Sequence, residues 1–319
     1  MAERTDKNSH TIIMVGAGPA ALSAAIYTTR EDIETLLLEK AIPGGMAAIT
    51  DVIDNYPGFP QGVPGTELAL NLQQQAERFG AVIEPAEVLG LHDEGEWKRL
   101  ETTDGDLYAR AVLIATGSDY KKLGIPGEAE YYARGVHYCA TCDGAFYRDK
   151  RIAVVGGGNS AVQETIFLTR FATHIDLMVR SRLRASDVLK KELQEYVEAG
   201  KVTVHLGTTT DEIRAGENNL VNAIIGTETA TGKKVEIPVD GVFVFIGLNP
   251  NSKFLNGALE LDEVGLIKTD ENLTSSIPGV FVAGDIRSGA TMQVASAVGE
   301  GATAALKIRE YLEDLDRKA

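Results

Sequence analysis

Short, nearly continuous apolar runs recur along the chain, separated by stretches in which apolar residues have helical spacing. In the first part of the chain these runs are Thr11–Val15, Thr35–Leu38 and Val112–Ala115. Runs of this length are typical of strands buried on both faces of a parallel sheet. Leu22–Arg30 lies between the first two runs and is typical of a helix, so a strand–helix–strand unit is predicted here.

The same succession begins again in the middle of the chain. Arg151–Val155 and Ile175–Val179 are predicted strands, Val162–Phe171 is the helix between them, and Val242–Ile246 is a later buried strand. A repeated pattern of this kind predicts an α/β protein with parallel sheets. At 319 residues the chain is long enough for two domains that each bury a core.

The remaining stretches complete the two sets of elements. We predict helices over Thr66–Phe79, Leu189–Glu198 and Gln293–Leu312, strands with turns over Ala81–Thr103, an antiparallel meander over Val202–Val239, and a strand over Val280–Ala283. Gly124–Gly127 is interpreted as a linker. The loop region Pro43–Pro60 is long for a connection, and long loops in compact domains usually have a function.

A glycine-rich loop follows the first strand. Gly16 and Gly18 begin a G-x-G-x-x-A pattern that continues through Pro19 and Ala20 into the predicted helix. Glycines at these positions allow a tight turn and let backbone N–H groups at the helix N-terminus approach a pyrophosphate. The second strand ends in Glu39, whose carboxylate can accept hydrogen bonds from a ribose. The pattern predicts a dinucleotide site; the alternative is a glycine-rich turn without a ligand.

A second G-x-G-x-x-A pattern follows the strand Arg151–Val155 and contains Gly156, Gly158, Asn159 and Ser160. The next strand of this unit ends without an acidic residue and runs into Arg180-Ser181-Arg182-Leu183-Arg184. Guanidinium groups at this place can hold a 2′-phosphate, which favours NADP over NAD. The alternative is a solvated basic turn.

Near the C-terminus, the predicted strand Val280–Ala283 runs into Gly284-Asp285. A Gly-Asp pair at a strand end can place a carboxylate on a ribityl or ribose hydroxyl and backbone groups on a phosphate. Asp285 is therefore a candidate cofactor-binding residue.

The chain holds two cysteines, Cys139 and Cys142, in a C-x-x-C spacing. Thiols spaced in this way can close a small disulfide ring that opens and closes readily, which suits electron transfer better than a structural cross-link. Asp143 follows directly and is a candidate proton carrier for a thiolate, with a solvated turn aspartate as the alternative. The same pair of cysteines could instead be a zinc half-site or two inert buried thiols. No second C-x-x-C is present and the five histidines have no ligand spacing, so no metal site is predicted.

Composition restricts the location and the partners. The net charge of -15 argues against a nucleic-acid partner and against an anionic membrane surface. Met1–His10 is polar and no apolar run reaches the length of a membrane span, so a cytoplasmic protein is predicted. In a reducing compartment a dithiol is more often catalytic than structural.

Together these motifs resemble the low-molecular-weight thioredoxin reductase family over nearly the whole chain. The resemblance rests on the two G-x-G-x-x-A units with Cys-Ala-Thr-Cys-Asp-Gly between them, and on Gly44-Gly45, Asn55–Phe59, Ala115–Gly117, Gly124–Glu128 and Ala283–Asp285. It implies two Rossmann-like, three-layer ββα nucleotide-binding domains of the pyridine nucleotide-disulfide oxidoreductase type. These are a discontinuous FAD-binding domain of residues 1–118 and 247–319, and a pyridine-nucleotide-type domain of residues 119–246 that carries the dithiol.

The resemblance also implies roles for individual residues. In the family the second cysteine, here Cys142, exchanges electrons with the flavin, the first, here Cys139, attacks the disulfide of a thioredoxin-like partner, and Asp143 serves as acid and base. A homodimer is implied, as is a swing of one domain against the other about the connections near residues 118 and 246. The implied FAD-binding residues are Gly16, Gly18, Pro19, Ala20, Glu39, Gly45, Asn55, Thr116, Gly284, Asp285, Gln293, Val294 and Ala295.

Three departures from the family pattern concern the electron donor, and one of them is Asn159, where members usually have aspartate. NADPH-using members typically carry His-Arg-Arg where this chain has Met178-Val179-Arg180, so the histidine and one arginine are missing while Arg180 and Arg184 remain. Members usually have Arg-Gln-Ala where this chain has Met292-Gln293-Val294. The combination resembles the branch without a working NADPH site, some of whose members take electrons from ferredoxin. NADPH and ferredoxin therefore both stay open as donors.

Docking of a ferredoxin, which is acidic, to this acidic chain requires a local basic patch. The candidates are Lys121-Lys122, Arg148–Arg151 and Arg180–Arg184.

Two different functions share parts of this pattern. A ferredoxin or flavodoxin NADP reductase of related fold would lack the C-x-x-C. A flavoprotein redox sensor would use the same disulfide to switch a partner, but no segment resembles an effector.

Overall fold

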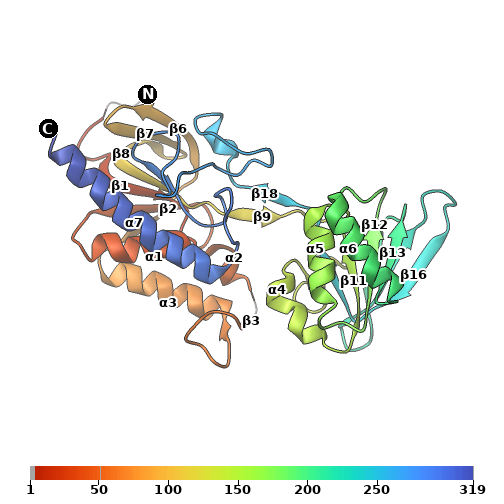
Figure 1. Cartoon of the computed structure of the whole chain (residues 1–319). Helices are drawn as coiled ribbons and strands as arrows, with labels where there is room; N and C mark the ends of the chain where they lie inside the picture. The colour runs from red at the N-terminus through yellow and green to blue at the C-terminus, as the bar shows by residue number, and fades with distance from the viewer. Residues whose placement is uncertain (1–3, 51, 319) are drawn as a thin grey trace. The chain divides into compact units, whose positions relative to one another are not determined.

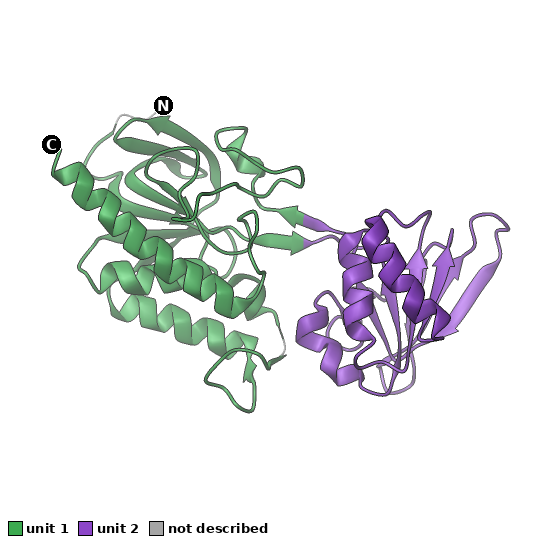
Figure 2. Ribbon diagram, viewed as in Figure 1, with its two compact units in different colours: residues 1–119, 249–319 green, residues 120–248 purple. Residues whose placement is uncertain are grey.

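The computed structural model describes residues 4–50 and 52–318. These residues form two compact units (Figure 2). Unit 1 combines the chain up to Asp119 with the chain from Asn249 onward, and unit 2 is the continuous stretch Tyr120–Leu248. The domain boundaries predicted from the sequence, at 118/119 and 246/247, lie close to this division. The cofactor assigned to each domain stays a prediction.

Unit 1 is built on a seven-stranded sheet in the order β5-β2-β1-β8-β7-β6, with β19 paired to β8. The strands are β1 (Ser9–Val15), β2 (Thr35–Glu39), β5 (Val82–Pro85), β6 (Val88–Glu94), β7 (Trp97–Thr102), β8 (Gly105–Ile114) and β19 (Val280–Val282). β5, β2, β1, β8 and β19 run parallel, whereas β6, β7 and β8 form an antiparallel meander. The carboxyl ends of β1, β2, β8 and β19 therefore meet at one edge of the sheet.

Three helices lie together in unit 1 (Figure 1): α1 (Pro19–Thr29), α3 (Gly65–Arg78) and α7 (Val294–Asp316). α1 is rich in buried alanines, which lets its neighbours approach closely. At Gly301 of α7, an added Cβ would lie 2.1 Å from the carbonyl oxygen of Ala20, so the two helices touch backbone to backbone. The loop region after β2 contains α2 (Gly45–Ala48) and the short hairpin of β3 (Val52–Ile53) and β4 (Val63–Pro64).

A second hydrophobic core of unit 1 involves the segment after residue 250. Leu255, at the end of η2 (Lys253–Leu255), and Ile267 pack with Ile13 of β1 and Val112 of β8 in this core. The alanine-rich core around α1 is a separate cluster. The central strands are therefore buried by side chains of both clusters, as their continuous apolar sequences predicted.

Unit 2 contains an all-parallel five-stranded sheet in the order β10-β17-β11-β12-β13. Its strands are β10 (Val136–His137), β11 (Arg151–Val155), β12 (His174–Val179), β13 (Val202–Leu206) and β17 (Gly241–Val244), and its helices are α4 (Ala140–Asp143), η1 (Gly144–Tyr147), α5 (Asn159–Leu168) and α6 (Asp187–Glu198). A separate antiparallel sheet is formed by β14 (Glu212–Ala215), β15 (Val221–Thr227) and β16 (Lys234–Pro238). Both units have the α/β architecture that the sequence predicted.

Two local predictions were wrong. The meander predicted over Val202–Val239 begins later, because β13 pairs in parallel with β12 at the edge of the parallel sheet. An edge strand exposed on one face alternates apolar and polar residues as a meander strand does, so the pattern does not distinguish them. Gly124–Gly127 is not a linker: it lies inside unit 2, where the Glu128 carboxylate accepts hydrogen bonds from the Leu123 and Gly124 N–H groups at 2.7 Å each.

The chain passes between the units at β9 (Ser118–Tyr120) and β18 (Leu248–Pro250), which pair with each other. The Lys121 N–H donates to the Gly247 carbonyl at 3.0 Å, and the Asn251 N–H donates to the Gly117 carbonyl at 3.1 Å. These bonds extend the antiparallel register of the pair at both of its ends.

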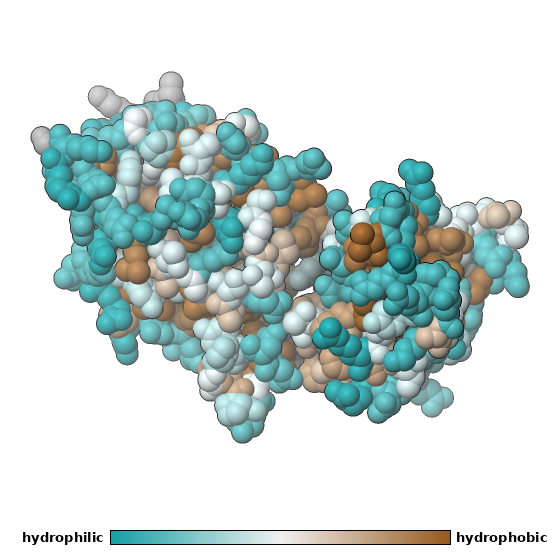
Figure 3. Space-filling view, viewed as in Figure 1, coloured by the Kyte–Doolittle hydropathy of each residue, from teal (hydrophilic) through white to brown (hydrophobic). Residues whose placement is uncertain are grey.

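Within the described ranges, no helix has the length and apolar composition that a membrane span requires. The face shown in Figure 3 is mostly hydrophilic, with apolar residues in small groups. Single exposed apolar side chains of this kind are ordinary on a protein surface.

Candidate cofactor and dithiol sites

The first glycine loop, Gly16–Gly18, lies at the carboxyl edge of the unit 1 sheet between β1 and α1. Gly16 has φ +98°, and a Cβ on it would lie 2.7 Å from the Ala115 carbonyl oxygen, so only glycine fits. Gly18 caps α1 without a side-chain hydrogen bond, and a Cβ on it would meet nothing within 4 Å. Pro19 follows as the first helical residue. The uncapped N-terminus, with open space in front of Gly18, fits a phosphate group.

Glu39 ends β2 next to this loop. One carboxylate oxygen accepts a hydrogen bond from the Ala17 N–H at 2.8 Å, and the other accepts one from the Ala41 N–H at 2.9 Å. These bonds fix the orientation of the carboxylate while leaving lone pairs on both oxygens. Such a carboxylate can accept further hydrogen bonds from the two hydroxyls of a ribose.

A second pair of glycines packs on the first glycine loop. The Gly44 N–H donates to the Ala17 carbonyl at 2.7 Å, and a Cβ on Gly45 would lie 3.5 Å from the Gly18 Cα. Both glycines have positive φ, 104° and 53°. The start of the long loop after β2 is thereby held against the N-terminus of α1, as close packing around a pyrophosphate requires.

The carboxyl end of β19 adds Gly284 and Asp285. The Gly284 N–H donates to Glu300 of α7 at 2.8 Å, and Glu300 also forms an ion pair with Arg287 at 2.5 Å. The Asp285 carboxylate accepts no hydrogen bond from the residues that the structure describes. Burial and the nearby Glu300 carboxylate raise the pKa of Asp285 to about 6. A half-buried carboxylate without a partner among the described residues fits a hydroxyl-bearing ligand at this edge.

Two hydrogen-bonded pairs complete this edge of unit 1. Asn55 Nδ2 donates to Gln293 Oε1 at 3.0 Å, which joins the long loop to the uncapped start of α7, where Val294 and Ala295 follow. Thr116 and Asn251 exchange two hydrogen bonds, at 2.9 and 3.0 Å. The first of these pairs joins candidates that are 238 positions apart in the chain. Asn251, Arg287 and Glu300 were missed because no local motif marks them.

The predicted residues fit FAD in their chemistry. They supply a glycine-rich helix N-terminus for a pyrophosphate, a fixed carboxylate for a ribose, and the unpartnered Asp285 for a ribityl hydroxyl.

The second glycine loop, Gly156–Gly158, lies between β11 and α5 in unit 2. Gly156 has φ +152°, and a Cβ on it would lie 2.3 Å from the Phe245 carbonyl oxygen. The loop after β12 packs on it: the Arg184 N–H donates to the Gly157 carbonyl at 2.6 Å, and the Ser186 N–H donates to Asn159 Oδ1 at 2.8 Å. Ser160 is exposed in the first turn of α5.

Three arginines lie in this loop after β12. Arg180, Arg182 and Arg184 are all exposed, and none of their side chains forms a hydrogen bond or an ion pair with another residue of the described chain. Their charge is therefore available to an anionic ligand or partner next to the second glycine loop. Arg180 and Arg184 are the two arginines that the sequence assigned to a 2′-phosphate.

The dithiol lies in unit 2 at the start of α4. Cys139 and Cys142 form a disulfide with 5.3 Å between their Cα atoms, and both residues are half-buried. Cys139 is the N-cap of α4, where its Sγ accepts a hydrogen bond from the Cys142 N–H at 3.1 Å. A sulfur at a helix N-terminus is in a position that favours the thiolate. Asp143 ends the same helix and has a side chain that is 24% exposed.

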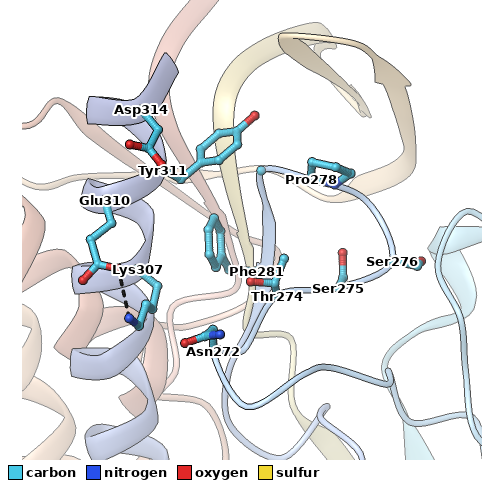
Figure 4. A pocket seen from close by; sticks show the side chains of 11 residues that line it. Asn272, Thr274, Ser275, Ser276, Pro278, Phe281, Lys307, Glu310, Tyr311 and Asp314 are labelled. Carbon is cyan, nitrogen blue, oxygen red and sulfur yellow. Dashed lines mark hydrogen bonds and ion pairs between the residues drawn. The ribbon is translucent and has the colours of Figure 1, made fainter. Parts of the chain in front are cut away.

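The described residues contain no group of histidine, cysteine, aspartate and glutamate side chains that could hold a metal ion. A surface cavity of about 480 Å³ lies in unit 1 between α7 and the segment 272–281. Figure 4 shows the Lys307–Glu310 ion pair and the rings of Phe281 and Tyr311 at this cavity. None of the predicted site residues lines it, so it is separate from the candidate sites.

Comparisons with known proteins identify relatives along nearly the whole chain. The model of the pyridine nucleotide-disulphide oxidoreductase family matches residues 10–301. The chain is 39% identical over 312 residues to a thioredoxin reductase of Bacillus subtilis, covering 98% of this chain and 97% of that protein. It is 37% identical to a thioredoxin reductase of Listeria innocua, covering 98% and 96%. The crystal structure of thioredoxin reductase from Streptococcus pyogenes superposes with a TM-score of 0.90 at 36% identity, covering 96% of this chain and 99% of that one.

Proposed function

Because this chain belongs to the pyridine nucleotide-disulphide oxidoreductase family, and its resemblance to the low-molecular-weight thioredoxin reductases is confirmed, we propose that it reduces the disulfide of a thioredoxin-like protein with electrons passed through FAD. The chain is an oxidoreductase with the fold class predicted from its sequence. The observation that carries the proposal is the half-buried Cys139–Cys142 disulfide in a chain that also has a dinucleotide-type glycine loop at the sheet edge of unit 1.

The proposed FAD site is the edge of unit 1 described above. Gly16, Gly18, Pro19 and Ala20 would form the loop and helix start that hold the pyrophosphate, Glu39 would orient a ribose, and Asp285 would accept a hydrogen bond from a ribityl hydroxyl. FAD, when bound, supplies a two-electron carrier that can reduce the disulfide. Gly45, Asn55, Thr116, Gly284, Gln293, Val294 and Ala295 shape the remaining edge.

The dithiol performs the exchange with the partner. Cys139 attacks one sulfur of the partner disulfide, the S–S bond of the partner breaks, and the departing thiolate takes a proton. Cys142 then attacks the Cys139 sulfur, which releases the second partner thiol and forms the Cys139–Cys142 disulfide again. Two electrons and two protons thereby move from the thiols of this chain to the two partner sulfurs. Asp143, next to Cys142, takes and returns protons in these steps.

NADPH is the first proposed donor, and the unpaired Arg180 and Arg184 next to the second glycine loop support it. A reduced ferredoxin is the second. The motif around Arg180 lacks a histidine and an arginine that NADPH-using members carry, and three exposed, unpaired arginines favour docking of an acidic protein as well.

Anaerobic flavin reduction distinguishes the donors. The loss of oxidised flavin absorbance is followed after mixing with NADPH, NADH or chemically reduced ferredoxin. If NADPH is the donor, the double variant Arg180→Gln, Arg184→Gln needs at least roughly tenfold more NADPH, whereas Lys233→Gln, which removes an exposed charge at the turn after β15, does not. Bleaching by ferredoxin alone establishes the second donor. Failure of all three donors contradicts both.

Reduction of oxidised thioredoxin, with a Cys139→Ser variant as control, tests the proposal as a whole. Turnover that depends on Cys139 supports a reductase. A stable complex with very slow turnover would support the redox-sensor alternative. We also propose a homodimer in the cytoplasm, on the family resemblance and the composition; light scattering of the purified protein tests the dimer.

A further inference from the structure

His137 lies two positions before Cys139, in the buried end strand β10. Its side chain is 9% exposed. The imidazole ring stacks on Phe243 of β17, with 5.1 Å between centroids and 29° between planes, and meets Tyr147 edge-on at 5.2 Å. A buried imidazole held between two aromatic rings has little freedom to rotate, so the directions of its two nitrogens are fixed.

Both nitrogens of this ring have partners. Nδ1 lies 3.2 Å from Oδ2 of Asp143, and Nε2 lies 2.6 Å from the Tyr147 hydroxyl. A carboxylate at this distance favours a proton on the nitrogen that faces it, so we assign a proton to Nδ1. In the neutral imidazole Nε2 then accepts, and the Tyr147 hydroxyl donates to it. The three side chains thus form one polar chain, with a hydrogen bond between Tyr147 and His137 and an ion-pair contact between His137 and the Asp143 carboxylate.

Tyr147 is suited to be the fixed donor at the far end of this chain. Its residue is buried, with the ring packed against Gly241, where an added Cβ would lie 2.3 Å from Cε1. Burial raises the pKa of Tyr147 above its ordinary value, and the negative charges of Asp143 and Asp240 make smaller contributions in the same direction. The phenol therefore stays protonated throughout the range in which thiols exchange.

We propose that His137 is a positioning residue for disulfide exchange: with Tyr147 behind it, its Nδ1 holds the Asp143 carboxylate in place at the end of the helix that carries Cys142. The proposal rests on the proposed function. In the exchange step Asp143 takes the proton of a cysteine thiol, the thiolate attacks the partner disulfide, and Asp143 gives the same proton to the thiolate that leaves. His137 and Tyr147 keep their own protons.

The charged and titratable groups around Tyr147, His137 and Asp143 come from several elements. Asp143 faces the ring of His137 from α4, and Phe243 of β17 adds no charge. Tyr132 lies near Asp143. Burial raises the pKa of Tyr132, and the negative charge of Asp143 raises it further. Asp240 acts on Tyr147, and the Lys150 ammonium lies 5.4 Å from the centre of the Tyr147 ring. No other side chain in the described ranges forms a hydrogen bond or ion pair with His137.

The test removes single hydrogen bonds and leaves the packing in place. Tyr147→Phe deletes only the hydroxyl that fixes Nε2. His137→Phe keeps a ring for stacking but removes the donor to Asp143. His137→Asn keeps an N–H donor close to the position of Nδ1. Tyr132→Phe is the matched control, since it deletes a hydroxyl near Asp143 that makes no hydrogen bond with the described residues.

The readout is the pH dependence of one exchange step. The protein with its FAD is reduced chemically, freed of reductant, and mixed anaerobically with 5,5′-dithiobis(2-nitrobenzoate), whose leaving thiolate is stable without a proton. This assay needs no NADPH, ferredoxin or thioredoxin. Asp143→Asn assigns the acid limb of the rate profile: a limb that belongs to Asp143 disappears in this variant.

Hydrogen bonding to a carboxylate lowers its pKa, so loss of the donor moves this limb to higher pH. We expect an upward shift of this limb in His137→Phe, a smaller shift in Tyr147→Phe, and a profile close to wild type in His137→Asn and Tyr132→Phe. An unchanged limb in His137→Phe overturns the proposal, as does a Tyr147→Phe profile identical to that of Tyr132→Phe or a limb that survives Asp143→Asn.

Thermal unfolding of each variant shows whether the fold is intact, and Tyr147→Phe tests the proposal even if His137→Phe does not fold. The failure of the proposed function is a separate result. If the variants show the expected shifts with the small disulfide but the wild-type protein never reduces thioredoxin, the assigned partner is contradicted. The role of His137 is not. A chain that reduces thioredoxin with unshifted profiles contradicts only the role of His137.

Discussion

Gly301 and Gly299 lie two positions apart in α7, yet the structure predicts opposite effects for the same substitution. A Cβ on Gly301 would lie 2.1 Å from the Ala20 carbonyl oxygen and 2.9 Å from its carbon, whereas a Cβ on Gly299 would meet nothing within 4 Å. Both glycines are helical, so both substitutions by alanine gain the same helix propensity. Only Gly301→Ala forces α7 away from α1.

The size of the effect follows from this overlap. An ordinary carbon contact needs about 3.5 Å, so α7 has to move by about 1 Å against the backbone of α1. Overpacking of this kind costs about 3 kcal/mol, and the gain in helix propensity is about 1 kcal/mol. We expect a net loss of about 2 kcal/mol in Gly301→Ala and a gain of about 1 kcal/mol in Gly299→Ala.

Thermal unfolding followed by flavin fluorescence measures both changes. For a unit of this size each kcal/mol corresponds to about 2–4 °C. The unfolding midpoint should fall by about 4–8 °C in Gly301→Ala and rise by about 2–4 °C in Gly299→Ala. Gly301→Ala should also retain less FAD, because Ala20 lies in the first turn of α1 and Glu300 holds Gly284. If both variants are stabilised, α1 and α7 do not meet at Gly301 and the reasoning is wrong.

Three further predictions concern the dithiol and two carboxylates. Cys142→Ser should accumulate a covalent complex between Cys139 and oxidised thioredoxin, visible on a nonreducing gel, because no thiol is left to resolve it; the complex should be absent in Cys139→Ser. Asp285→Asn should stabilise the cofactor-free protein at neutral pH. Because the pKa of Asp285 is raised in the folded state, the wild-type protein loses stability as pH rises from 3.8 to about 6. Thermal midpoints measured across this range should show that decrease in the wild type and not in the variant. Asp176→Asn should destabilise unit 2 by about 3 kcal/mol at neutral pH. Burial disfavours the Asp176 charge, but hydrogen bonds from His205 and Arg151 outweigh it and hold its pKa below 3.8, so this stability is present above pH 3.8 and lost as pH falls through the lower folded value. Urea unfolding of wild type and Asp176→Asn should therefore differ at neutral pH and converge in strong acid.

The sequence predicted the elements whose signals are local. The strand before Gly16, the helix after it and the acid at Glu39 follow from apolar runs and turn residues that are close together in the chain, and the structure has them in that order. The strand before Gly284 was predicted from the same kind of local signal, and the structure has β19 at Val280–Val282. The C-x-x-C spacing predicted a small disulfide ring for the same local reason.

Contacts between distant side chains could not be predicted. Glu300 of α7 accepts a hydrogen bond from the Gly284 N–H 16 positions before it, and Asn251 bonds with Thr116 across 135 positions. Neither residue belongs to a motif. An amide or a carboxylate on a helix or loop is usually solvated, so its presence in the sequence does not indicate a contact. No motif marks His137 either, and its contact with Asp143 depends on how α4 and η1 turn the chain back after the cysteines.

The pairing of β9 with β18 makes unit 2 an insertion with neighbouring ends. Unit 2 is one uninterrupted stretch, and it leaves and re-enters unit 1 through two strands that are hydrogen-bonded to each other. A short hairpin turn could therefore replace the whole of Tyr120–Leu248 without separating the two parts of unit 1. Such a site allows one domain to be exchanged for another during evolution while the sheet that receives it keeps its register.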